Sequence, residues 1–161
     1  MNKQKIAPVS KIEERKAAAK FEGVTPILRV QSLPASIDYY LSILGFKVDW
    51  CEPGIMASVS RDRCSVMLCE GDQGNPGIWV WIGVADIETL FEEYKNNGAK
   101  VRQPPTNYPW ACEMQIEDPD GHVLRLGSEP KKDQLYGEWR DGRGEIWVLS
   151  PTGGWTRVER V

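Results

Sequence analysis

Three polar side chains that could do chemistry lie on one predicted hairpin, residues 112–127. Its strands are joined by residues 118–121, Asp-Pro-Asp-Gly, a sequence typical of turns, because proline presets the backbone and glycine accepts a left-handed conformation. Side chains alternate along each strand, so Glu113, Gln115 and Arg125 share the face opposite the apolar residues. A carboxylate there could act as a general base or attract a cation, and a guanidinium could stabilise an oxyanion.

Aromatic residues supply a second kind of surface. The segment 78–84 has aliphatic residues at alternate positions, suited to packing against helices, which sends Trp79 and Trp81 to the opposite face. The same alternation places Ile27 and Met67 on that face of two earlier strands. Indole rings hold flat molecules by stacking, and cations by attraction to the ring quadrupole. Three more aromatic residues lie near strand ends and loops, at the expected rim of this site: Trp50, Tyr108 and Trp110.

The elements that must position these residues form an internal repeat. The sequence predicts a strand, a helix and three strands at 24–31, 36–44, 46–51, 55–60 and 63–70. After the glycine-rich segment 71–77 the same order recurs, with a strand at 78–84, a helix at 86–97, a short strand near 100–103 and the hairpin. We therefore predict an α+β domain, residues 23–130, in which two βαβββ modules, 23–71 and 77–129, form a cup-shaped mixed sheet.

Two appendages flank this domain. Residues 1–22 are predicted to form a helical arm, in which Ser10 and Glu13 have the spacing of a capping box. Residues 131–161 are predicted to form a short β meander with one tryptophan in each strand, at a constant spacing of eight: Trp139, Trp147 and Trp155. A meander this small cannot be stable alone, so we expect these tryptophans to pack it onto the domain or a second copy, although it could also cover the mouth of the cup.

Composition narrows the classes of function. The net charge is −3, and residues 21–130 carry 16 acidic against 8 basic side chains, a balance that disfavours nucleic acid and mildly favours cationic small molecules. No apolar run is long enough to span a membrane and the N-terminal segment lacks a secretory signal, so we expect a cytoplasmic protein. The four cysteines lack metal-site spacing and are expected to be small buried residues. The single histidine, His122, is expected at the surface or at a strand start.

Several segments, taken in order, resemble the vicinal oxygen chelate superfamily of glyoxalases, bleomycin-resistance proteins and extradiol dioxygenases. They are residues 24–30, 39–46, 84–87, 97–99, 109–110 and 118–121, and the resemblance covers about residues 24–128. It implies paired βαβββ modules that form an open cup, and often a dimer that completes two cups.

The resemblance also implies where a metal would be held. Catalytic members of the superfamily hold a divalent metal on His and Glu side chains at four strand positions. The matching positions here are Thr25, Met67, Trp79 and Arg125. None offers an imidazole or a carboxylate, and the permanent positive charge of Arg125 would repel a metal. We therefore expect no metal, no other cofactor and no catalytic residue, as in the bleomycin-resistance branch, which binds a drug without transforming it.

The expected function is metal-independent binding or sequestration of a small aromatic organic molecule, including cationic ones, by a homodimer. One alternative is a metal-independent lyase or isomerase, with Glu113 as base and Arg125 as oxyanion stabiliser, although pairing with Arg125 would make Glu113 a poorer base. Another is a protein-interaction module that uses the arm and the meander and leaves the cup idle. The plainest alternative is that the tryptophans fill the cup as ordinary core and that Glu113 and Arg125 form a cross-strand ion pair.

Overall fold

The structure of the chain, a computed structural model, describes residues 23–149 and 154–158. The predicted helical arm, residues 1–22, lies outside the described residues. Within those residues, no helix is long and apolar enough to cross a membrane.

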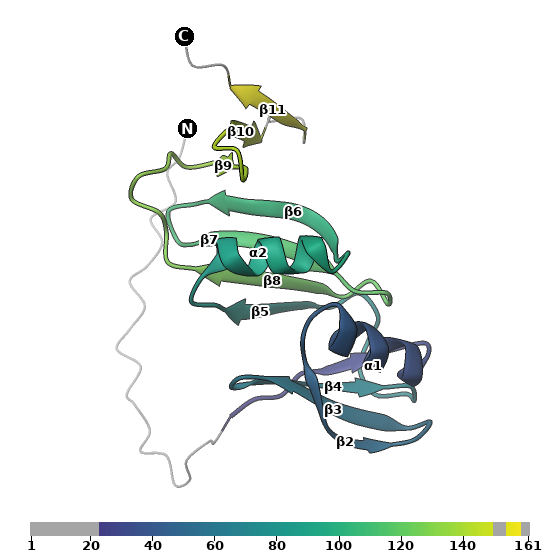
Figure 1. The fold of residues 1–161 in the computed structure, drawn as a ribbon. Helices are drawn as coiled ribbons and strands as arrows, with labels where there is room; N and C mark the ends of the chain where they lie inside the picture. Colours follow the sequence, from purple (N-terminus) through teal and green to yellow (C-terminus); the bar gives the residue numbers. More distant parts are fainter. Residues whose placement is uncertain (1–22, 150–153, 159–161) are drawn as a thin grey trace, which may run out of the picture.

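Two modules of the same order confirm the predicted α+β repeat (Figure 1). The first contains β1 (Ile27–Arg29), α1 (Leu33–Ser42), β2 (Lys47–Glu52), β3 (Met56–Arg61) and β4 (Cys64–Cys69). The second contains β5 (Trp79–Gly83), α2 (Ile87–Asn96), β6 (Lys100–Asn107), β7 (Cys112–Glu117) and β8 (Val123–Ser128). Sheet A has the strand order β1-β4-β3-β2 and sheet B the equivalent order β5-β8-β7-β6. In each sheet the first strand pairs in parallel with the last and the other pairs are antiparallel.

Local sequence signals account for the ends of both helices. Asp86 caps α2, accepting hydrogen bonds at 3.1 Å from the backbone N–H groups of Glu88 and Thr89. The helix stops before Gly98, whose φ of 82° suits glycine. The other helix, α1, starts three residues before the predicted position. Pro34 fits the first turn of a helix, because backbone N–H groups there have no acceptor within the helix and the N–H that proline lacks is not needed.

Strand β6 is longer than the sequence predicted. It continues through Pro104 and Pro105, where the prediction ended it at about residue 103. Two features of its position permit this: β6 lies at the edge of sheet B among the main-domain strands, and its register with β7 shifts between Gln103 and Thr106. A proline at such a place removes no essential ladder hydrogen bond.

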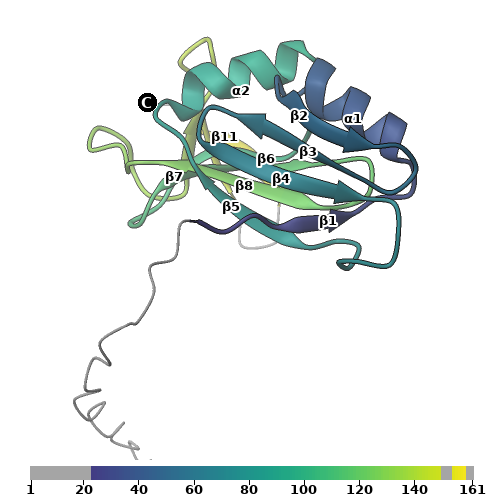
Figure 2. The same cartoon turned by 90° about the horizontal axis from the view of Figure 1, so that it is seen from below.

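Both helices lie along the same side of the two sheets (Figure 2). Helix α1 packs against β2, β3 and β4, and α2 against β6, β7 and β8. Apolar residues from both modules join in one buried core, whose largest members include Tyr40, Tyr94, Leu28, Leu68 and Leu124. The face of each sheet that points away from its helix is called its open face below.

The junction between the modules is held by His122. It directly precedes β8, which agrees with the prediction of a strand start, but it is not at the surface, the other position predicted for it. The side chain is fully buried, at 0% exposure. Its Nδ1 accepts a hydrogen bond from the Ile78 N–H at 3.2 Å, so the ring proton lies on Nε2, which donates to the Arg29 carbonyl at 2.7 Å. Asp118 accepts from the His122 N–H and from the Tyr40 hydroxyl, and burial raises the pKa of this carboxyl. A histidine with both ring nitrogens paired is a structural link between the modules.

The C-terminal extension forms the predicted meander from β9 (Glu138–Arg140), β10 (Ile146–Leu149) and β11 (Trp155–Val158). The ring of Trp139 lies 6.1 Å from Trp147 and 5.7 Å from Trp155, and 6.0 Å from Phe91 of α2. Trp139 therefore packs the meander onto α2 of the second module, and the other two tryptophans pack on Trp139. This agrees with the expectation that the meander packs onto the domain.

Two of the four cysteines depart from the expectation of burial. All four are free thiols; Cys69 and Cys112 are buried, but Cys51 and Cys64 are exposed. Cys51 lies on β2, an edge strand of sheet A, and Cys64 begins β4 directly after a turn, so neither is covered on all sides.

Candidate functional site

The open face of sheet B gathers seven of the ten predicted site residues. Strand pairing sets Trp81 of β5 opposite Arg125 of β8, and Arg125 opposite Gln115 of β7. The row continues to Gln103 of β6. One polar and aromatic band thus crosses all four strands. The seven residues on or beside this face are Trp79, Trp81, Tyr108, Trp110, Glu113, Gln115 and Arg125.

An ion pair lies at the centre of this face. Arg125 Nη2 donates to both carboxylate oxygens of Glu113, each at 2.8 Å. The Glu113 side chain is 5% exposed and the Arg125 side chain 35%, so the carboxylate is covered while the guanidinium still reaches the surface. The Trp110 Nε1–H also points at Glu113, at 3.4 Å. Such a pair is electrically neutral and its carboxylate is already saturated with donors.

Trp81 covers the middle of the sheet. Its ring lies directly over Gly127, and the Arg125 guanidinium carbon is 5.3 Å from the ring centroid. Trp81 remains 50% exposed, so one side of the indole is available for stacking. On the same strand Trp79 is 53% exposed and has the Arg102 guanidinium 5.4 Å from its centroid.

A second aromatic pair borders the face. The rings of Tyr108 and Trp110 are stacked, with centroids 5.0 Å apart and planes 5° from parallel. Gln115 Nε2 donates to Gln103 Oε1 at 3.1 Å, and Gln103 Nε2 donates to the Tyr108 hydroxyl at 3.2 Å. Burial raises the pKa of Tyr108, which keeps the hydroxyl neutral. The chain of amides therefore holds the Tyr108–Trp110 stack in place beside the ion pair.

Sequence reasoning missed three residues of this face. Gln103 was taken as the last residue of a short strand, and its alignment with Gln115 depends on a register shift that the sequence did not reveal. Arg102 lies over Trp79 for the same reason. Gly127 leaves room for the Trp81 ring because it has no side chain. The sequence indicated this only by placing a glycine inside a predicted strand, where glycine often marks a close approach of another group.

The other three predicted site residues lie on sheet A. Ile27 is paired with Met67, and Trp50 is opposite Ser58. In the described part of the chain, no hydrogen bond, ion pair or ring contact joins Ile27, Met67 or Trp50 to Trp81 or Arg125. One chain therefore presents two separate open faces, one on each sheet.

The positions that correspond to metal ligands do not fit a metal. Thr25 shares a hydrogen bond of 3.3 Å with Ser65, Trp79 presents a ring, and Arg125 presents a cation paired with Glu113. Across residues 23–149 and 154–158, no three His, Cys, Asp or Glu side chains group closely enough to hold a metal ion. The donor set at this face suits an organic ligand.

This fold defines a class of proteins built from two βαβββ modules, each with a mixed four-stranded sheet. Residues 21–126 match the family model of the Glyoxalase/Bleomycin resistance protein/Dioxygenase superfamily, and the chain belongs to this superfamily. A comparison with curated proteins gives no match.

Solved structures share the fold at low sequence identity. The bleomycin-binding protein from bleomycin-producing Streptomyces verticillus, complexed with copper(II)-bleomycin, is 23% identical with a TM-score of 0.59, over 70% of this chain and 99% of that chain. TnmS3, an antibiotic binding protein from Streptomyces sp. CB03234, is 22% identical with a TM-score of 0.61, over 70% and 99%. A glyoxalase/bleomycin resistance protein/dioxygenase from Nocardioides is 20% identical with a TM-score of 0.56, over 73% and 91%.

Proposed function

We propose that the chain binds and sequesters a small aromatic molecule on the open face of sheet B, without a metal. The observation that carries this proposal is the placement of two exposed indoles, Trp81 and Trp110, on either side of the self-neutralised Glu113–Arg125 pair. Flat aromatic surfaces with a few fixed polar groups are typical of small-molecule sites. The bleomycin-binding and antibiotic binding proteins of the same fold support a binding role.

We propose that the site prefers cationic over anionic ligands only slightly. The acidic main domain favours cations, but Arg102 and Arg125 already lie over Trp79 and Trp81, and Glu113 is neutralised. Two contributions to cation binding remain, the quadrupole of the indole rings and the screened field of the acidic domain, each worth about 1 kcal/mol of binding free energy. Planar cations should therefore bind at most about tenfold more tightly than isosteric anions.

The geometry supports binding better than the alternatives. A carboxylate that accepts from Arg125 through both oxygens, and from Trp110, is badly placed to remove a proton from a substrate. Trp139 packs on Phe91, and Trp147 and Trp155 pack on Trp139, so the rings of the meander contact one another and the domain instead of forming a presented interaction surface. Of the plainest alternative, the cross-strand ion pair of Glu113 and Arg125 is present, but Trp79 and Trp81 are half-exposed and therefore are not core residues.

We also propose that two copies pair, so that the open face of sheet A on one copy lies against the open face of sheet B on the other. Trp79, Trp81 and Trp110 are 50–64% exposed on one face, a patch of the kind that marks an interaction surface. Pairing would bring Ile27 and Met67 opposite these indoles. Light scattering after gel filtration should give twice the chain mass of 18.2 kDa. A monomer at micromolar concentration would contradict the pairing.

The cytoplasmic location stays a prediction, which the four free thiols support.

The binding proposal is tested by titrating tryptophan fluorescence with a matched cationic and anionic aromatic pair at two salt concentrations. Trp81→Ala should weaken both probes about fivefold or more, because one stacking face is lost. Tyr136→Ala, which removes an exposed aromatic ring from the extension, serves as the control. Unchanged affinity in Trp81→Ala would show that the open face of sheet B is not the site.

A further inference from the structure

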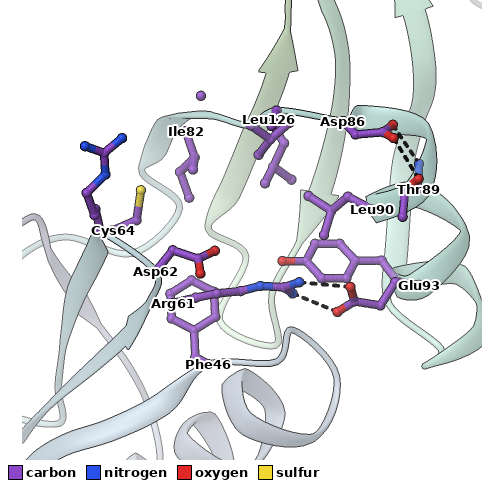
Figure 3. Close-up of a pocket in the computed structure, with 15 residues that line it drawn as sticks. Phe46, Arg61, Asp62, Cys64, Ile82, Asp86, Thr89, Leu90, Glu93 and Leu126 are labelled. Atoms are coloured by element: carbon purple, nitrogen blue, oxygen red, sulfur yellow. Dashed lines mark hydrogen bonds and ion pairs between the residues drawn. The ribbon is translucent and has the colours of Figure 1, made fainter.

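A cavity lies between the modules, on the helix side of the sheets (Figure 3). Its volume is about 410 Å³, within the range of small-molecule sites. Strands β5 and β8 separate it from the open face: Ile82 and Leu126 line the cavity, whereas Trp81 and Arg125 alternate with them on the other side. The two surfaces are therefore distinct.

One wall of this cavity is apolar. The side chains of Ile82, Leu90 and Leu126 point into the same space (Figure 3), and Phe46 closes it from the first module. Ile82 and Leu90 are only partly buried, so the cavity leaves apolar surface that a ligand could cover. The wall therefore suits the hydrocarbon part of a small molecule.

Most charged groups around the cavity are already satisfied. Arg61 makes a two-point ion pair with Glu93, at 2.7 and 2.9 Å, and donates to the Leu44 carbonyl at 2.7 Å. Asp86 is used as the cap of α2. Burial raises the pKa of Tyr94 to about 12, so its hydroxyl is neutral. None of these groups needs a ligand to complete it.

Two adjacent residues of the β3–β4 turn are different. Asp62 and Arg63 both line the cavity. In the described part of the chain, neither side chain forms a hydrogen bond, an ion pair or a ring contact. Figure 3 shows the Asp62 carboxylate beside the cavity. The cavity thus offers one free carboxylate, one free guanidinium and an apolar wall.

We propose that this cavity binds a small zwitterion with an apolar side chain, such as an apolar α-amino acid. The ammonium group would pair with Asp62, the carboxylate with Arg63, and the side chain would cover Ile82, Leu90 and Leu126. A ligand with a single charge leaves one of the two turn residues without a partner, so the zwitterion should bind most tightly.

Alkylation of Cys64 in the full chain provides a local readout. Cys64 is exposed and lines the cavity, whereas Cys51 is also exposed but lies on β2, outside this lining. Saturating phenylalanine should slow the alkylation of Cys64 at least about threefold and leave Cys51 unchanged, because a ligand that covers the thiol blocks the reagent. Three related probes are compared in this way: phenylalanine, phenethylamine and 3-phenylpropanoate.

Two variants separate the two charges. Asp62→Asn should weaken phenylalanine and phenethylamine about fivefold and leave 3-phenylpropanoate unaffected. Arg63→Gln should weaken phenylalanine and 3-phenylpropanoate by a similar factor and leave phenethylamine unaffected. Asparagine also tolerates the left-handed backbone at residue 62, where φ is 54°, so the turn is retained. Asp72→Asn, an exposed aspartate in the segment between the modules, is the control.

The outcomes are distinguishable from those for the open face, because the readout uses no tryptophan. If no probe at millimolar concentration slows the alkylation of Cys64, the cavity is not a site and the proposal is wrong. If all three probes protect Cys64 equally, the apolar wall alone binds and the zwitterion is the wrong class.

Discussion

Trp81 rests on Gly127 so closely that a Cβ at residue 127 would lie 2.3 Å from Cη2 of the indole. Gly127→Ala should therefore displace the ring. Because Trp81 is half-exposed, it can move outward, so the free energy of unfolding should fall by no more than about 1 kcal/mol. Affinity for aromatic probes should fall as in Trp81→Ala, which fluorescence titration measures.

Gly83→Ala is the matched control for this substitution. Gly83 is paired with Gly127 on the neighbouring strand, but nothing lies within 4 Å of the position its Cβ would take. It should leave both stability and affinity close to those of the unchanged chain. Equal effects of the two substitutions would contradict a specific role for the Trp81–Gly127 contact.

The Glu113–Arg125 pair should respond asymmetrically to removal of either partner. Arg125→Met leaves the carboxylate of Glu113, which is 5% exposed, without its cation, and should cost about 3 kcal/mol of unfolding free energy. Glu113→Gln leaves a guanidinium that water can still reach, and should cost about 1 kcal/mol. Urea denaturation measures both.

The double variant completes this cycle. Its cost should be well below the sum of the two single costs, because no charge is then left buried alone. If Glu113→Gln proved the more damaging single change, the carboxylate would not be the covered partner that the structure shows.

Cysteine reactivity should follow exposure. In the folded protein, an alkylating reagent should modify Cys51 and Cys64 at near-neutral pH and leave Cys69 and Cys112 unmodified. Burial raises the pKa of the Cys112 thiol to about 11, so it lacks both access and thiolate. Mass spectrometry before and after addition of denaturant distinguishes the two groups; early modification of Cys112 would show that β7 opens in the folded state.

Strand alternation made much of this architecture predictable. Apolar residues at every second position of β5 fixed which face holds Trp79 and Trp81, and the structure leaves both exposed on that face. The turn at 118–121 and the glycine after each helix set the boundaries of the repeat. Whether the exposed residues bind a ligand stays a prediction.

The features that sequence did not predict depend on contacts between distant segments. His122 is buried because a backbone carbonyl at residue 29 and an N–H at residue 78 meet its ring, and no local pattern encodes that meeting. The alignment of Gln103 with Gln115 needed a register shift around two prolines. Likewise, the distribution of Ile27 and Trp81 over separate open faces follows from how the modules pack, which residue spacing does not determine.

An ion pair between Arg61 and Glu93 joins the modules beside the cavity. Hydrogen bonds from Arg61 lower the pKa of Glu93. A carboxyl whose pKa is lower in the folded state contributes stability that is fully present above its unfolded pKa of about 4.5 and is lost as the pH falls through the folded pKa. The side chains are 28% and 37% exposed, so solvent screening limits the contribution to about 0.5–1 kcal/mol.

Glu93→Gln should therefore be less stable than the unchanged chain by about 0.5–1 kcal/mol at neutral pH, and the difference should vanish as the pH falls below the folded pKa of Glu93. Urea denaturation at several pH values between about 2 and 7 measures the difference, on either side of the ordinary Glu pKa. Glu92→Gln is the control, since Glu92 is exposed and its Lys95 partner is 3.7 Å away. A difference that persisted unchanged into acid would mean that Glu93 stabilises the junction by packing and not by its charge.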